Sequence, residues 1–184
     1  YRRAHEQAEI DRESQEAAKA EVRLREHAGS LPEAHPQRIE HFHYLKGTGA
    51  VSLLTDVDDV EVILEQYVPH HRRLVPKVIA NLGKSPVISH SLEVGSYRLR
   101  LRKEGHREVL YPVSIGRGEH WDGVDPTGIQ RPVHLPKLEV LGENDCYVPG
   151  GWFWAGGDKQ AARSLSRRRV WVDSVVMKKF PVTN

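Results

Sequence analysis

The chain has 184 residues, 39% hydrophobic and 28% charged, and its 27 Lys and Arg against 25 Asp and Glu give a net charge of +2. This length allows one domain with additions or two small ones, and the near balance of charge does not indicate nucleic-acid binding by itself. The single cysteine, Cys146, excludes an intramolecular disulfide framework. No apolar run reaches the roughly 20 residues of a membrane-spanning helix. The chain has neither an initiator Met nor a signal-peptide pattern, so we expect a piece of a longer polypeptide.

The N-terminal segment predicts two helices. Residues 1–28 contain no Gly or Pro and are rich in Ala, Glu and Arg, which indicates a helix that ends at Gly29. Alanines occupy most of its apolar positions, so a solvated linker helix is favoured over a coiled coil, which needs larger heptad residues. A shorter helix is expected within residues 33–46, from Pro36 to Lys46, with its apolar face packed on the β-module that follows.

Alternating apolar residues predict a β-domain over residues 47–116. After Gly95, three apolar residues alternate with three arginines, as in a strand with one buried and one solvated face. Glu104-Gly105 offers a turn, and a second alternating run completes a β-hairpin. Two earlier strands flank an acidic turn at residues 56–59. The expected core-facing positions are Val60, Val62, Leu64, Tyr97, Leu99, Leu101, Val109, Tyr111, Val113 and Ile115.

Residues 65–80 interrupt this pattern. Pro69 and Pro76 frame the basic stretch His70-His71-Arg72-Arg73, which predicts an inserted loop or extended excursion. Without a glycine-rich turn or stacking aromatics, the stretch is expected to be solvated and not to bind nucleic acid. The arginines of the later strand are likewise expected to form a solvated face, balanced by Glu93, Glu104 and Glu108.

Histidines and aspartates raise the question of a metal site. His41 and His43 flank Phe42 without zinc-type spacing, and the pair His70-His71 has none either. The aspartates of residues 56–59 lack the closing glutamate of an EF-hand and suit a turn. Cys146 has no assigned His and Asn partners. We expect no catalytic residue, no cofactor-binding residue and no metal ligand.

The segment from Gly49 to Ile115 resembles a PEGA domain, a small β-sandwich-like module. The resemblance rests on Leu82-Gly83-Lys84-Ser85-Pro86, Gly95-Ser96-Tyr97 and Gly105-His106, which are similar to the family's Leu-Gly-x-Thr-Pro, Gly-x-Tyr and glycine turn. The sequence departs from the family in having Val57 where a turn proline is usual. The resemblance implies structural roles for Gly83, Pro86, Gly95, Tyr97 and Gly105.

The C-terminal part changes character. Residues 117–146 are rich in turn formers and are expected to be a linker. Residues 147–184 resemble the opening of a formylglycine-generating-enzyme (sulfatase-modifying factor) domain, through residues 148–153, which read Val-Pro-Gly-Gly-Trp-Phe, and residues 181–184, which read Pro-Val-Thr-Asn. The resemblance implies short strands from the start of that domain, without its catalytic cysteines or calcium ligands.

The order of helix, PEGA-like module and sulfatase-modifying-factor-like opening is similar to that in large bacterial serine/threonine protein kinases. No kinase signature occurs in these residues. The resemblance therefore implies a non-catalytic interaction or spacer region between the kinase and the sulfatase-modifying-factor-like domain. Its implied partners are other domains of the same chain or another protein, with no membrane insertion by this segment, in a cytoplasmic location with a parent chain that could be membrane-associated.

The expected fold class is α+β, mainly β, with N-terminal helices, an antiparallel sandwich-like module and short C-terminal strands. Two other functions fit the sequence. A β-domain that binds a glycan or peptide would use exposed Trp121, Trp152 and Trp154 for stacking, although tryptophans are more often core residues. The segment could also position the substrate of a formylglycine-generating-type enzyme.

Overall fold

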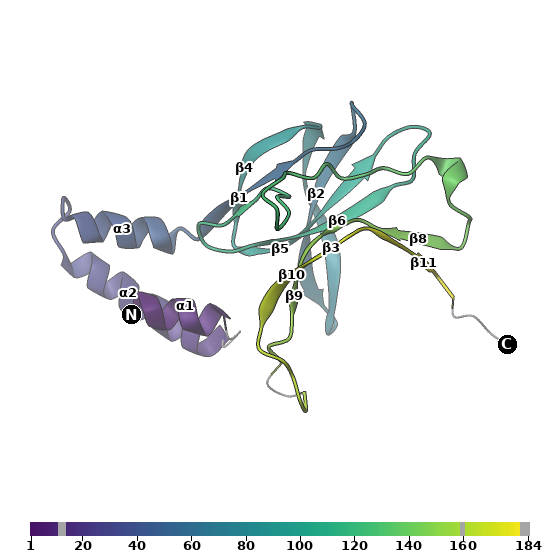
Figure 1. Cartoon of the computed structure of the whole chain (residues 1–184). Coiled ribbons are helices and arrows are strands. Elements are labelled where there is room, and N and C mark those ends of the chain that lie inside the picture. The colour runs from purple at the N-terminus through teal and green to yellow at the C-terminus, as the bar shows by residue number, and fades with distance from the viewer. Residues whose placement is uncertain (11–13, 159–160, 181–184) are drawn as a thin grey trace. The chain divides into compact units, whose positions relative to one another are not determined.

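The computed structural model describes residues 1–10, 14–158 and 161–180 (Figure 1). The chain forms two compact units, residues 1–48 and residues 49–184. The expected motif at residues 181–184 lies outside the described part of the chain. Among the described residues, no helix is both long enough and apolar enough to cross a membrane.

The first unit contains three helices, α1 (Arg2–Ile10), α2 (Ser14–Ser30) and α3 (Pro36–Leu45). The single helix expected over residues 1–28 is therefore wrong, because α1 and α2 are separate helices that pack against each other. Their alanines allow this close approach, and the residues buried in the unit include Ala8, Ala20, Leu24 and Ala28. High helix propensity runs through the whole segment, so propensity alone could not locate the break.

The third helix confirms the expected helix after Pro36 but not its expected partner. α3 packs against α2 and belongs to the helical unit rather than to the β-unit. The His5 Nδ1 atom of α1 lies 2.9 Å from the hydroxyl of Tyr44, and Arg38 donates a hydrogen bond of 2.6 Å to the carbonyl of Leu31. These polar contacts hold α3 to α1 and to the end of α2, and His5 is buried among them.

The second unit is built on two sheets (Figure 1). The four-stranded sheet has the order β3-β2-β5-β6, with every neighbouring pair antiparallel. The three-stranded sheet has the order β4-β1-β7, and β1 and β7 are parallel. The expected fold class, mainly β with N-terminal helices, is confirmed. The strands are β1 (Thr48–Leu53), β2 (Glu61–His70), β3 (Arg73–Lys84), β4 (Val87–Glu93), β5 (Gly95–Arg102), β6 (Val109–Ile115) and β7 (His120–Trp121).

The core of this unit contains all ten positions expected to face it. The β5–β6 hairpin is confirmed, with Gly105 at φ +76° in the turn, where a side chain would be strained. The acidic turn is also confirmed, and Asp59 has φ +56°. The strands on either side of this turn, β1 and β2, lie in different sheets, so the turn carries the chain from one sheet to the other.

Of the two alternatives expected for residues 65–80, the structure has the extended excursion and not the inserted loop, because these residues continue β2 and β3 as a hairpin. His71 and Arg72 form its two-residue turn with φ of 47° and 62°. β2 pairs with β5 only as far as Gln66, so residues 67–76 form a two-stranded ribbon that extends past the sheet, and we call this segment the ribbon. The two prolines broke the sequence pattern, but a proline is tolerated in a strand where its nitrogen points away from the partner strand.

Residues 117–146 are rich in turns, as expected, but they are not a simple linker. They contribute β7, which pairs with β1, and Val133 bridges to Thr55. Trp121, Val133 and Leu135 are buried in the core. A two-residue strand has no periodicity that a sequence pattern could detect, which is why this contribution was missed.

The C-terminal residues form short strands, as expected. These are two antiparallel pairs, β9–β10 and β8–β11. Within the described residues, each pair is only two strands wide, so much of its apolar surface is uncovered. The elements are η1 (Leu138–Val140), β8 (Asp145–Val148), β9 (Gly151–Ala155), β10 (Arg168–Val172) and β11 (Val175–Lys178). Their exposed apolar residues include Val148, Phe153, Val172, Val175, Val176 and Met177.

Candidate functional site

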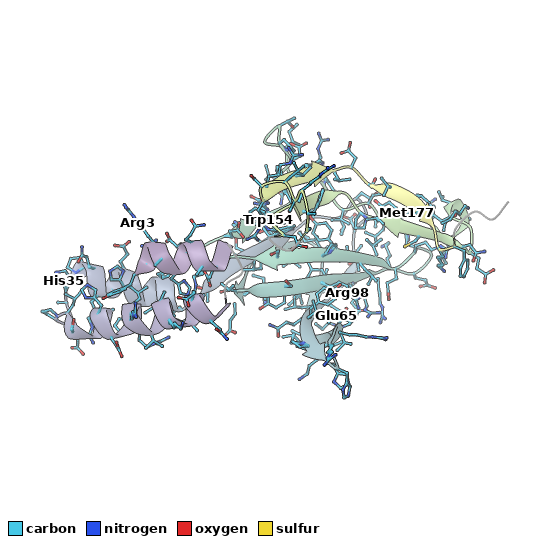
Figure 2. All side chains as sticks on the ribbon, turned by 90° about the horizontal axis from the view of Figure 1, so that it is seen from below. Arg3, His35, Glu65, Arg98, Trp154 and Met177 are labelled. Atoms are coloured by element: carbon cyan, nitrogen blue, oxygen red, sulfur yellow. The ribbon has the colours of Figure 1, made fainter. Side chains whose placement is uncertain are left out.

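A cluster of ion pairs covers the outer face of the four-stranded sheet (Figure 2). Glu65 in β2 is only 2% exposed. Its Oε1 atom accepts hydrogen bonds of 2.6 and 2.9 Å from Arg100, and its Oε2 atom accepts one of 2.6 Å from Arg98. Glu108 joins the cluster by accepting hydrogen bonds from Arg100 and Arg102. The face expected to be a solvated arginine stripe is therefore a connected network of opposite charges.

The electrostatics of this network follow from the buried carboxylate. Burial by itself raises the pKa of Glu65, but the hydrogen bonds from Arg100 and Arg98 outweigh it, and the pKa lies below its ordinary value. The hydrogen bond to Glu65 raises the pKa of Arg100. Glu108 was expected to balance the arginines, whereas the role of Glu65 was missed. Because each of these arginines is already paired with a carboxylate, the face has a structural role rather than that of an anion site.

The five motif residues occupy structural positions. Gly83 (φ +84°) lies where β3 has an extra residue relative to β2. A Cβ atom on Gly95 would lie 3.2 Å from the Tyr97 ring, whose hydroxyl donates a hydrogen bond to the Glu93 carbonyl. Burial raises the pKa of Tyr97. Pro86 follows a cis peptide bond between β3 and β4, and Gly105 forms the β5–β6 turn.

The three candidate stacking tryptophans do not form one exposed face. Trp121 is buried, and its indole nitrogen donates to the Tyr111 hydroxyl at 3.3 Å. Trp152 is half-buried and donates a hydrogen bond of 2.7 Å to the carbonyl of Val124. Trp154 alone of the three is exposed (Figure 2). The expectation that Trp121 is an exposed binding residue is therefore wrong.

Arginines cover the tryptophans of the β9–β10 pair. The Arg169 guanidinium lies 4.9 Å from the ring centroid of Trp121 and 5.0 Å from that of Trp152. Arg167 lies 4.2 Å from the ring centroid of Trp154. Cation–π contacts of this kind attach the hairpin to the core and occupy the aromatic faces that a sugar would need.

One nucleophile and one base meet in the three-stranded sheet. The Oγ atom of Ser52 lies 2.8 Å from Nε2 of His120 and accepts a hydrogen bond from the Ser89 backbone nitrogen. A hydrolytic serine needs an exposed oxygen and a third group that orients the base. Ser52 is buried, and no acceptor for the other ring nitrogen of His120 occurs in the part of the chain described. The contact joins β1, β4 and β7 instead.

Acidic side chains in the β-unit accept hydrogen bonds that stabilise its loops. Asp125 is buried and accepts hydrogen bonds from Thr127, Ile129 and Arg131. The Thr127 hydroxyl contributes most to holding the pKa of Asp125 well below its ordinary value, against the opposing effect of burial. Asp56 accepts a hydrogen bond from the backbone of Leu135. The hydrogen-bond donors of these carboxylates are groups of the protein itself, as is usual for aspartates in turns.

Metal-type side chains do not converge within the described residues, where no group of three or more His, Cys, Asp or Glu could hold an ion. The rings of His70 and His71 contact each other at the tip of the ribbon, with 4.2 Å between their centroids. His41 lies near His27, and the side chain of His43 is outside the described part. Cys146 is exposed and is paired with Met177 across β8 and β11.

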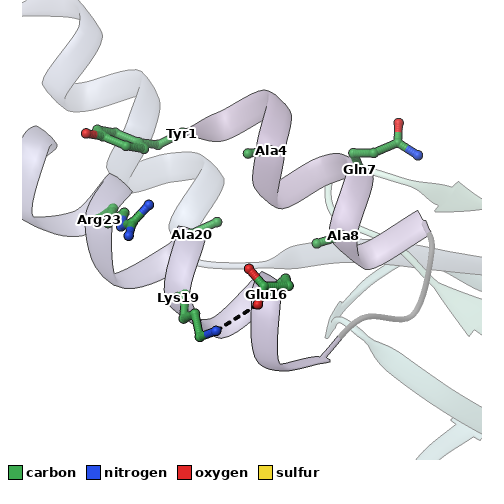
Figure 3. Close-up of a pocket in the computed structure, with 8 residues that line it drawn as sticks. All are labelled: Tyr1, Ala4, Gln7, Ala8, Glu16, Lys19, Ala20 and Arg23. Atoms are coloured by element: carbon green, nitrogen blue, oxygen red, sulfur yellow. Dashed lines mark hydrogen bonds and ion pairs between the residues drawn. The ribbon is translucent and has the colours of Figure 1, made fainter.

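A shallow groove of about 340 Å³ lies between α1 and α2 (Figure 3). Alanines form much of its floor, and Lys19 donates a hydrogen bond of 2.7 Å to Glu16 at one end. Among the described residues that line the groove, no base lies beside a nucleophile. It is lined by Tyr1, Ala4, Gln7, Ala8, Glu16, Lys19, Ala20 and Arg23.

Comparison with known proteins identifies one family in part of the chain. Residues 79–122, from the second half of β3 through β7, match the model of the PEGA domain. The expected PEGA resemblance is thereby confirmed for these residues, and the match reaches six residues beyond the expected boundary at residue 116. No curated protein and no solved structure matches the chain. The part of the β-unit from residue 79 to residue 122 is thus similar to a PEGA domain, which is a non-catalytic type of domain.

Proposed function

We propose that this chain is a non-catalytic interaction and spacer region of a multidomain bacterial serine/threonine protein kinase, between the kinase domain and a sulfatase-modifying-factor-like domain. The observation that carries the proposal is the contrast between two surfaces of the β-unit. Its PEGA-type core is closed, whereas the antiparallel pair formed by β8 and β11 has an uncovered apolar surface. Met177 is 58% exposed and Val176 is 52% exposed. Apolar strands of this kind are stabilised when another protein surface covers them.

The charged and nucleophilic groups of the β-unit support a non-catalytic role. Glu65 and Asp125 are neutralised by arginines, and Ser52 is buried. A catalytic serine or carboxylate needs access to a substrate, which these groups lack. Since Trp121 is also buried, a glycan-stacking surface is not favoured by the geometry.

A comparison of two polypeptides tests the proposal. The 184-residue chain and the longer polypeptide that contains it are incubated with labelled ATP, and we expect phosphate incorporation only in the longer one. Hydrogen exchange is then compared between the two polypeptides for the backbone amides of the two paired strands β8 and β11. We expect slower exchange in the longer polypeptide, because the following domain would cover these strands.

Two results would contradict the proposal. Phosphate incorporation by the 184-residue chain itself would show catalysis in this segment. Equal exchange of β8–β11 in both polypeptides would show that no further domain covers these strands. The longer polypeptide could instead oxidise a cysteine-containing peptide. That result would favour the alternative function, in which the segment positions the substrate of a formylglycine-generating-type enzyme, over the kinase proposal.

A further inference from the structure

The outer edge of β3 is open, both within the ribbon and in the rest of the strand. β3 is the outer strand of the four-stranded sheet, and within the described residues it pairs with β2 alone. It is twelve residues long, and most of its side chains are exposed. An outer strand leaves alternate backbone N–H and C=O groups without a partner, so it is a template for another strand.

The side chains of β3 divide into two faces with different chemistry. Because successive residues of a strand point to opposite sides, Leu74, Pro76 and Val78 share one face of β3. Arg73, Val75 and Lys77 share the other face, where the two cations flank the valine. Leu74 is 65% exposed and Val78 is 60% exposed. A strand added at this edge would meet apolar residues on one face and cations on the other.

Positive charge predominates along this edge. Residues 66–84 contain four Arg and Lys residues and no Asp or Glu. Lys84 forms an ion pair with Asp59. For Arg72, Arg73 and Lys77, the described residues provide no ion-pair partner. In contrast to the arginines of β5, which are paired with carboxylates, these three cations are available to an acidic partner.

We propose that β3 binds an extended acidic segment of a protein partner by strand addition. Alternating acidic and apolar residues in that segment would place carboxylates opposite Arg73 and Lys77 and apolar side chains beside Leu74 and Val78. The backbone hydrogen bonds contribute affinity, and the alternation contributes specificity. This inference deepens the interaction function proposed above and rests on it.

Other occupants fit the edge less well. A second copy of the chain would bring the same positive charge to the edge, and this like charge opposes self-pairing. Insertion into lipid would bury unpaired backbone groups at a cost of several kcal/mol each. Nucleic acid would gain little from the exposed apolar face, and three available cations contact few phosphates.

The test measures fluorescence anisotropy of a labelled peptide of alternating Glu and Val titrated with the 184-residue chain. Two peptide controls accompany it. An alternating Lys and Val peptide reverses the charge, and an alternating Glu and N-methyl-Val peptide keeps the charge but loses half of the backbone donors. We expect saturable binding of the first peptide and at least about tenfold weaker binding of each control.

Two protein variants with the same change in net charge complete the design. Arg73→Glu with Lys77→Glu removes the cationic face of β3, and we expect about tenfold weaker peptide binding. Arg3→Glu with Lys137→Glu changes exposed residues elsewhere and should bind as the parent chain does. Circular dichroism and urea unfolding establish that each variant is folded, and the peptide controls need no variant.

Three outcomes would overturn the inference. Equal binding of the N-methylated peptide would show charge attraction without strand pairing. Binding to phosphatidylserine vesicles without peptide binding would indicate a membrane surface, and a dimer in sedimentation that Arg73→Glu with Lys77→Glu dissociates would indicate self-association. None of these outcomes involves ATP, so phosphate incorporation by the 184-residue chain remains the separate result that contradicts the proposed function.

Discussion

Glu65 and Arg100, on neighbouring strands of the four-stranded sheet, are joined by two hydrogen bonds of 2.6 and 2.9 Å to one carboxylate oxygen. The other oxygen binds Arg98, so a nearly inaccessible carboxylate is shared by two arginines. Loss of one partner from a buried ion pair is costly because the remaining charge has lost its hydration without compensation. The stability of the sheet therefore depends on this residue more than on any exposed ion pair nearby.

The substitution Glu65→Gln should destabilise the chain. It keeps the shape of the side chain but leaves Arg98 and Arg100 without their shared carboxylate, and because both arginines retain some access to water we expect a loss of about 2 kcal/mol. Urea unfolding followed by circular dichroism measures the change. Glu104→Gln, an exposed substitution in the β5–β6 turn, is the control and should cost less than about 0.5 kcal/mol. Equal losses in both variants would contradict this role of Glu65.

The stabilising effect of Glu65 should disappear in acid. Its pKa in the folded chain lies below the ordinary value of 4.5, so the folded state favours the ionised carboxylate. The contribution is therefore fully present above about pH 4.5 and is lost as the pH falls through the folded-state pKa. The free-energy difference between the parent chain and Glu65→Gln should be constant from neutral pH to about pH 5 and narrow below that. A difference that widens in acid would disprove the assignment.

Gly49 should not tolerate a methyl group. A Cβ atom there would lie 2.5 Å from the Glu119 carbonyl oxygen and 2.7 Å from that of Gly116. Gly49→Ala should therefore separate β1 from β7 and lower the melting temperature by several degrees. Gly29, in the last turn of α2, has open space around its Cα, and Gly29→Ala should stabilise the helix by up to about 1 kcal/mol. Opposite signs in thermal unfolding are the expected result.

Trp121 and Trp154 should differ in their contribution to stability. Trp121→Ala removes a buried ring from the core and should cost about 3–5 kcal/mol. Trp154→Ala removes an exposed ring and its contact with Arg167, for a loss of about 1 kcal/mol or less. Urea unfolding of both variants measures the difference. A small effect at Trp121 would mean that residues 117–135 do not pack on the β-unit in solution.

The tip of the ribbon can be stabilised. His71 and Arg72 both have positive φ, a conformation that Asn and Gly adopt more readily. The double substitution His71→Asn and Arg72→Gly relieves the strain of these two conformations and should raise the free energy of unfolding by about 0.5–1 kcal/mol. Hydrogen exchange of the amides in residues 67–76 should slow in parallel. Faster exchange would indicate that the hairpin turn differs from the structure.

The alternation around Tyr97 predicted the core of the β-unit because each side chain there obeys a period of two. The same rule failed at Pro69 and Pro76, where prolines usually signal a loop, although an outer strand accepts them. It also failed at residues 117–135, whose burial comes from a few long-range contacts rather than from a repeated pattern.

The candidate sites show the same division between local and long-range information. Turn chemistry at Asp56 and Gly105 could be predicted from the residues themselves. The burial of Glu65 could not, because a glutamate in a strand is usually solvated and its partners lie more than thirty positions along the chain. The two faces of β3 could be recognised only from its pairing with β2, which shows that residues 67–70 and 73–78 belong to strands.

The parallel pairing of β1 and β7 also has a consequence for the order of folding. Ala50 lies opposite His120, seventy residues later in the chain, whereas the β5–β6 and β2–β3 hairpins join residues close in sequence. Closing so large a loop costs more entropy than forming a hairpin, and such contacts slow folding. The hairpins therefore form early and β7 adds late. Until β7 adds, β1 is an additional open edge, and an open edge of this kind favours aggregation of the newly made chain.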